Sequence, residues 1–160
     1  MNRLLKISVW ASVAAYMFFV IFNNLFDYNS NYQYISNVAS MNDVFEGNVH
    51  TWRSLQSSAL HHAMFAMIIL WKTTIFGLLA AGTYQMYRHL NDDKDAFENA
   101  KKYAQWGLGV GVLLWFLVFV AVGGEWFLMW QSKDWNGQEV GFSLTICFLL
   151  FANYLHQKDT

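Results

Sequence analysis

Residues 106–129, WGLGVGVLLWFLVFVAVGGEWFLM, decide the fold class, because they form a long apolar run with a single charged side chain, Glu125. A helix needs roughly 20 mostly apolar residues to cross the hydrocarbon core of a bilayer. This stretch is long enough to do so. It therefore predicts an integral membrane protein, and the remaining sequence is interpreted in that setting.

Three further windows have the same character: 7–26, 63–82 with a helical continuation to 90, and 140–155. The first follows a basic start but has no convincing small-residue cleavage site, so we interpret it as an uncleaved anchor. We predict an all-α membrane protein, a four-transmembrane-helix bundle that forms one domain over residues 1–160.

The composition agrees with a protein whose main solvent is lipid. Hydrophobic residues make up 56% of the chain and charged residues 13%, far from the mixture found in a soluble domain. The net charge of −1 provides no basic surface that would attract nucleic acid. The lipid bilayer is therefore the first partner that we expect.

Basic residues predict the orientation, because Lys and Arg accumulate on the cytoplasmic side of membrane proteins. Only Arg53 and Lys133 fall on one predicted side, and the other side carries Arg3, Lys6, Arg88, Lys94, Lys101, Lys102 and Lys158. We predict that both termini are cytoplasmic and that a long periplasmic loop, residues 27–60, joins helices 1 and 2.

The two longer connections have distinct expected structures. In the periplasmic loop we predict a short helix from about Asn42 onward. The cytoplasmic loop 89–102 contains the run Asn-Asp-Asp-Lys-Asp, which suits the capping of a short amphipathic helix before the third span. A solvated connector without function is the alternative interpretation of that loop.

Glycines indicate where helices pack, because close approach in lipid depends on small residues. Gly107 and Gly111 form a pair one turn apart, and Gly77 offers a similar surface on the second span. We expect these two spans to pack together in the cytoplasmic half. Gly123 and Gly124 weaken the third span further out, where a kink could aim the next carboxylate inward.

Lys72 lies near the middle of the second span, and an ionisable group at that depth is a candidate functional residue. No carboxylate of the chain is predicted at the same depth. Lys72 could snorkel, or donate a hydrogen bond to Tyr16 and exposed carbonyls. Alternatively, its counter-ion comes from another subunit or from a ligand.

The periplasmic ends of the spans gather a second set of candidates. A carboxylate near imidazoles could bind a metal, transfer a proton or hold a polar headgroup, and the alternative is a polar cap that satisfies helix ends. Adjacent histidines point about 100° apart on a helix, so we predict no metal site. The candidates are Asn23, Asn24, Asp27, Trp52, Arg53, His61, His62, Glu125, Trp126, Trp130, Trp135 and Asn136.

Haem is disfavoured as a cofactor, because no two histidines face each other from different helices within the predicted hydrocarbon core. A quinone or a lipid headgroup against the periplasmic tryptophans remains an alternative. We identify no catalytic residues, and the sequence predicts no enzyme.

Several short segments resemble one known family. They are FNN at 22–24, DY at 27–28, LHH at 60–62, VGGEWF at 122–127, MWQS at 129–132 and WNGQ at 135–138. Together they resemble a bacterial family of predicted small integral membrane proteins of unknown function. The resemblance implies a four-span, multi-pass protein of the bacterial inner membrane, and it implies no activity, substrate or cofactor.

Three functions are compatible with these observations. The first is a non-catalytic accessory or assembly subunit that binds other membrane subunits of a larger complex. The second is a membrane protein that binds a quinone, lipid or metal and has a redox role at the periplasmic face. The third is a small transporter, although the predicted spans offer few polar groups for a path.

Overall fold

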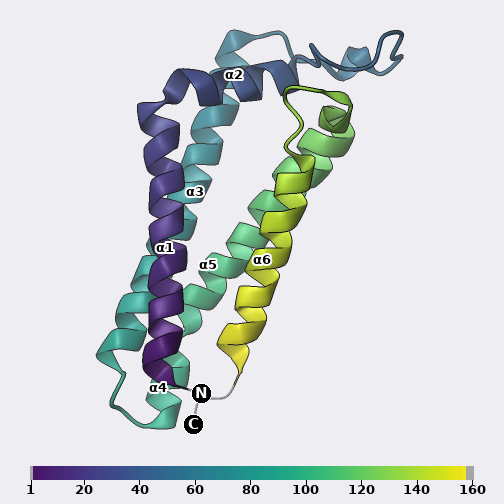
Figure 1. Ribbon diagram of the computed structural model, residues 1–160. Coiled ribbons are helices and arrows are strands. Elements are labelled where there is room, and N and C mark those ends of the chain that lie inside the picture. Colours follow the sequence, from purple (N-terminus) through teal and green to yellow (C-terminus); the bar gives the residue numbers. More distant parts are fainter. Residues whose placement is uncertain (1, 158–160) are drawn as a thin grey trace.

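The computed structural model describes residues 2–157, which contain helices and no strands. Four helical segments are long and apolar enough to cross a membrane, which confirms the predicted four-span, all-α fold. They are α1 (Arg3–Phe26), α3 (Ser58–Arg88), α5 (Lys102–Leu113) continued by the π-helical η2 (Leu114–Trp126), and α6 (Gln138–His156). Figure 1 shows them running between two ends of an elongated bundle.

One end of the bundle carries the short helix α4 (Lys94–Ala100), and the other carries α2 (Tyr28–Ala39), which lies across the tops of the long helices (Figure 1). We call these the α4 end and the α2 end. Helix α1 begins and helix α6 ends at the α4 end. Two short 3-10 helices, η1 (Thr51–Arg53) and η3 (Met129–Gln131), complete the α2 end.

The position of α2 corrects the prediction for the loop between the first two spans. A helix was expected from about Asn42, whereas α2 follows α1 almost directly and ends at Ala39. Met41 has a left-handed backbone with φ of 54°, a conformation that interrupts a helix. Tyr28, Tyr32 and Ile35 recur at helical spacing in α2, which gives it an apolar face toward α3.

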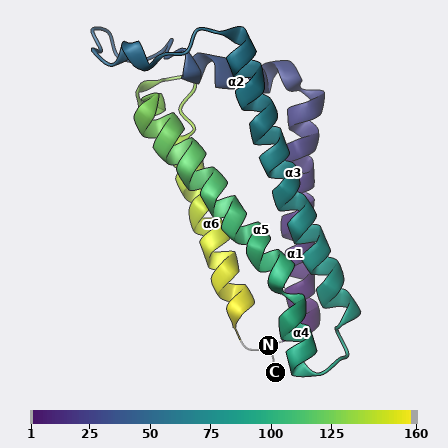
Figure 2. The ribbon, with the colours of Figure 1, turned by 180° about the vertical axis from the view of Figure 1, so that it is seen from behind.

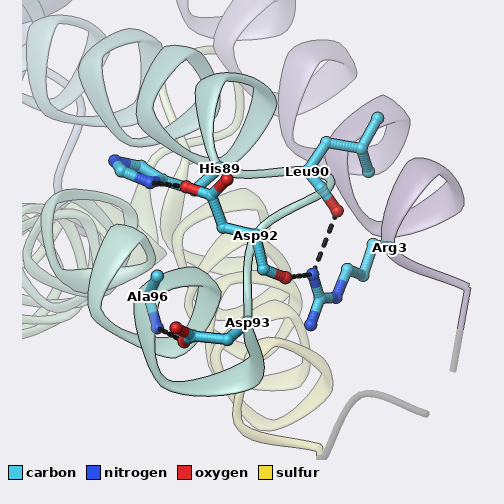
Figure 3. Close-up of polar contacts among 6 residues, drawn as sticks. All are labelled: Arg3, His89, Leu90, Asp92, Asp93 and Ala96. Atoms are coloured by element: carbon cyan, nitrogen blue, oxygen red, sulfur yellow. Dashed lines mark hydrogen bonds and ion pairs between the residues drawn. The ribbon is translucent and has the colours of Figure 1, made fainter.

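The predicted capped helix in the second connection is confirmed as α4. Asp93 is its N-cap, and the side chain accepts a hydrogen bond of 2.8 Å from the Ala96 N–H. Arg3 reaches this connection from α1 and donates to the carbonyl oxygens of Leu90 at 3.0 Å and Asp92 at 2.6 Å. Figure 3 shows these contacts, which fasten the start of α1 to the α4 end.

Small residues bring the helices into contact, with partners that differ in part from the prediction. Gly107 packs against Leu79 of α3, as its spacing suggested, but Gly111 packs against the Phe148 ring of α6. Gly77 faces open space. Helices α3 and α5 approach each other closely at Gly82, where an added Cβ would lie 2.7 Å from the Ala104 Cβ.

The long helices separate toward the α2 end. Figures 1 and 2 show α5 beside α3 near the α4 end, whereas its continuation η2 and the start of α6 lean away from α1 and α3. Helix α2 bridges the top of this divergence and packs on α3. The backbones of the two helix pairs therefore lie furthest apart beneath α2.

Candidate functional site

Lys72 lies in this region between the helix pairs. Its side chain is only 6% exposed, and Nζ donates a hydrogen bond of 2.8 Å to Oδ1 of Asn24 on α1. Helical side chains tilt toward the N-terminus of their helix, and α3 begins at the α2 end, so Lys72 extends in that direction. The hydrogen bond to Tyr16 that the sequence suggested is replaced by this contact with Asn24.

The partner of Lys72 is a neutral amide, which in turn belongs to a small network. Asn24 Nδ2 donates to Oδ1 of Asn31 on α2 at 3.3 Å, and Asn31 Nδ2 donates to the Asp27 carbonyl oxygen at 2.9 Å. Among residues 2–157, no carboxylate forms an ion pair with Lys72. The ammonium group is therefore buried with its charge uncompensated.

Aromatic rings surround the other side of the ammonium group. Nζ lies 5.6 Å from the ring centroid of Trp115 and 5.7 Å from that of Phe119, both on η2. Contacts of this kind attract a cation to the ring face. They lower the cost of burying Lys72, but they do not neutralise its charge.

A cavity of about 300 Å³ adjoins this group of residues. Its lining comes from α1, α2, α3, η2 and the beginning of α6, so the cavity occupies the space between the diverging helix pairs. Polar groups share the lining with aromatic and aliphatic side chains. The lining residues are Asn24, Asn31, Tyr34, Ile35, Phe65, Ile68, Lys72, Trp115, Phe119, Asn136, Gly137 and Val140.

Gly137 and Tyr34 line the cavity where the loop before α6 meets α2. A Cβ at position 137 would overlap the Tyr34 hydroxyl, so only glycine lets the loop before α6 approach α2 this closely. Tyr34 donates a hydrogen bond of 2.8 Å to Sδ of Met129, and its ring packs edge-on against Trp135. Burial raises the pKa of Tyr34 to about 12, partly offset by a hydrogen bond from the Gly137 backbone.

The two adjacent histidines have structural contacts with different partners. His61 is buried, with Nδ1 3.1 Å from the Ser36 hydroxyl and Nε2 2.8 Å from the Leu55 carbonyl oxygen. His62 instead stacks on Tyr32, with ring centroids 4.1 Å apart. Both rings attach α2 and its following loop to the start of α3.

Glu125 lies apart from the histidines and is exposed, so the expected inward turn at Gly123 and Gly124 does not occur. The helix continues as η2 through Trp126, and Glu125 accepts a hydrogen bond of 3.0 Å from Gln138 Nε2. No hydrogen bond or ion pair within the described residues joins Glu125 to His61 or His62. The same residues contain no group of three or more His, Cys, Asp or Glu side chains that could hold a metal ion.

The remaining sequence candidates at the α2 end fall outside the cavity, apart from Asn136. Arg53 lies between Trp52 and Trp126, 5.5 Å and 4.9 Å from their ring centroids. Trp130 packs edge-on against Phe45 in the loop. Asn23 and Asp27 are exposed on the turn between α1 and α2, where their backbone oxygens accept hydrogen bonds from Asn31.

A comparison with protein-family models gives a match over residues 2–158. The matching family is described as "Predicted small integral membrane protein (DUF2165)". The chain belongs to this family. No curated protein and no solved structure matches the chain significantly.

Membership of this integral membrane family confirms the resemblance seen in the sequence and places the protein in a lipid bilayer. The family description names no activity, so the cavity must be interpreted from its own chemistry. One ammonium group, several side-chain amides and a phenol line it. These groups suit the binding of an oxygen-rich headgroup rather than of a purely apolar molecule.

Among the lining residues that carry a polar side-chain atom, the sequence interpretation missed Asn31, Tyr34 and Trp115. Asn31 and Tyr34 belong to α2, which was predicted in the wrong place. The helical spacing of Tyr28, Tyr32 and Ile35 would have revealed it. Trp115 lies in a uniformly apolar stretch, and nothing in its sequence context distinguishes it from a lipid-facing residue.

Proposed function

We propose that this protein is a non-catalytic binding protein of the membrane that holds the polar head of an amphipathic molecule, a lipid or a quinone, beside Lys72. The observation that carries the proposal is a buried ammonium group with a neutral partner at the wall of a 300 Å³ cavity. A charged side chain near the centre of a membrane helix costs on the order of 3 kcal/mol. A ligand oxygen at Nζ would offset part of that cost.

The distribution of charge supports an orientation for the site. The cationic residues gather at the α4 end, which we propose to be cytoplasmic in a bacterial inner membrane. Both termini would then be cytoplasmic, and the cavity would lie in the periplasmic half of the bilayer. A ligand could reach it directly from the outer leaflet of that membrane.

Purification tests the proposal. The protein is extracted with a mild detergent, and lipids and quinones in the organic extract are identified by mass spectrometry. We expect one amphipathic molecule in an amount close to that of the protein. Val140→Trp would add bulk at the wall of the cavity and should lose this molecule, whereas Val49→Trp in the exposed loop should retain it. Equal amounts in the two variants would contradict the proposal.

An accessory subunit of a larger membrane complex is a second candidate. It is favoured by an aromatic ridge on α1, where Phe22 and Phe26 are exposed and stack with centroids 4.1 Å apart. Such a ridge could pack against a helix of another subunit. Native mass measurement of the same preparation tests this candidate, and a monomer without a bound protein would argue against it.

A further inference from the structure

A second hollow lies between α1 and α6. It has a volume of about 360 Å³ and a mostly apolar surface, to which the polar side chains of Ser12 and Tyr16 also contribute. A neighbouring hollow of about 400 Å³ continues toward the α4 end and shares Val9 and Phe151 with the first. Because they share these residues, the two hollows form one groove, which we call the α1/α6 groove.

The α1/α6 groove lies below the Lys72 cavity on the same faces of the same helices. On α1, Val13 lines the groove and Asn24 lines the cavity. On α6, Phe151 lines the groove and Val140 lines the cavity. Each pair is separated by eleven residues, which is about three whole helical turns. The polar cavity and the apolar groove therefore follow one seam along the bundle.

The length of this seam suits a long hydrocarbon chain. From Val140 at the cavity to Tyr154 at the far end of the groove, α6 rises by about 21 Å at roughly 1.5 Å per residue. The hydrocarbon core of a bilayer is about 30 Å thick. A chain that follows the seam from Val140 to Tyr154 would remain in apolar surroundings for most of that thickness.

The charge at the head of the seam selects among amphipathic molecules. The cavity lining contains a cation and no carboxylate, so an anionic head would supply the missing counter-charge. Trp115, which also lines the cavity, has a buried Nε1–H with no hydrogen-bond partner among residues 2–157. An ionised oxygen is a stronger acceptor for such donors than a quinone carbonyl.

We infer that the ligand of this protein is an anionic lipid, whose phosphate or carboxylate lies at Lys72 and whose hydrocarbon chain occupies the α1/α6 groove. This inference rests on the proposed binding function and specifies the ligand class. Lys72 and the amide of Asn24 select the head. The groove accepts the chain without selecting among headgroups.

Lipid retention after reconstitution tests the inference. The full chain is placed in phosphatidylcholine vesicles that contain a minor fraction of phosphatidylglycerol, then extracted in mild detergent. Native mass spectrometry measures how much of each lipid stays bound. We expect wild-type protein to retain phosphatidylglycerol about tenfold more than its share in the vesicle, the preference that one charge-assisted hydrogen bond supplies.

Two variants should abolish the preference for an anionic lipid, one by removing the positive charge and the other by pairing it with a carboxylate. Lys72→Gln deletes the cation, and Asn24→Asp places a carboxylate where Oδ1 already lies 2.8 Å from Nζ. Both should lose the tenfold preference. Lys72→Arg keeps the positive charge and should retain the tenfold preference for phosphatidylglycerol. Lys133→Gln removes one positive charge outside the cavity and serves as the control. If Lys72→Gln does not fold, Asn24→Asp, which keeps the polar pair, gives the decisive result.

A second pair of variants tests the groove. Ser8 and Ser12 are exposed on α1, and each hydroxyl bonds to the carbonyl oxygen one turn earlier, but only Ser12 lines the groove. Ser12→Phe should reduce retention of both lipids severalfold, whereas Ser8→Phe should match wild type. Equal retention by Ser12→Phe and Ser8→Phe would overturn the assignment of the chain to the groove.

The outcomes separate this inference from the proposed function. An unchanged phosphatidylglycerol preference in both Lys72→Gln and Asn24→Asp would overturn the anionic head. The anionic head would also be overturned if the wild-type protein retained a neutral lipid or a quinone and Val140→Trp lost it. In that case the proposed binding function would stand. A wild-type protein that retains no amphipathic molecule would overturn both.

Discussion

At the scale of the residue, the hydrogen bond between Lys72 and Asn24 is the central contact of the candidate site. The sequence identified both as candidates, because an ionisable group within a span is unusual and amides near a helix end can cap or bind. Their hydrogen bond could not be predicted. It depends on how α1 and α3 are rotated against each other, and neither helix has an apolar pattern strong enough to fix that rotation.

Asp43 offers a prediction at the same scale. The Ser132 hydroxyl and the backbone N–H groups of Lys133 and Asp134 donate to Asp43 Oδ2 and hold the pKa of this carboxyl below its usual value of 3.8. A lowered pKa in the folded state means that the ionised form stabilises the folded protein above pH 3.8. That contribution is lost as the pH falls from 3.8 through the lower folded value.

Asp43→Asn should therefore lower the thermal midpoint of the detergent-solubilised protein at neutral pH. The difference from wild type should persist down to about pH 4 and then disappear. The measurement is the midpoint of each protein across a series of pH values. A difference that grows as the pH falls below 4 would contradict the assignment.

At the scale of the element, the long helices were predictable and the short ones only in part. Four apolar runs are enough to locate α1, α3, α5 with η2, and α6, because lipid requires long apolar helices. The Asp-rich loop likewise predicted α4. Helix α2 was misplaced because it lies directly after the first span, where a loop was expected, although its apolar residues recur at helical spacing.

Contacts between helices give a matched pair of substitutions. Gly82→Val would place methyl groups against Ala104 and force α3 and α5 apart, which should cost about 1–3 kcal/mol. Gly77→Val, on the same helix, has open space within 4 Å of its Cβ and should leave stability nearly unchanged. Thermal midpoints in detergent measure both variants. Similar losses in the two would contradict the packing described for α3.

At the scale of the whole molecule, two helix pairs meet closely near the α4 end and diverge toward the α2 end (Figures 1 and 2). The divergence creates the cavity at Lys72, and α2 and the loop before α6 cover it. The sequence directed attention to Lys72 and to the polar α2 end. It suggested a single site there, whereas the structure separates the cavity from the histidines and from the tryptophans around Arg53.

The central claim is that an amphipathic molecule occupies the cavity beside Lys72. A density map of the protein, purified gently from its native membrane, tests it most directly. We predict density for a headgroup within hydrogen-bonding distance of Lys72 Nζ, continuous with density for a chain between α1 and α6. An empty cavity, or one filled by a side chain of another protein, would contradict the claim.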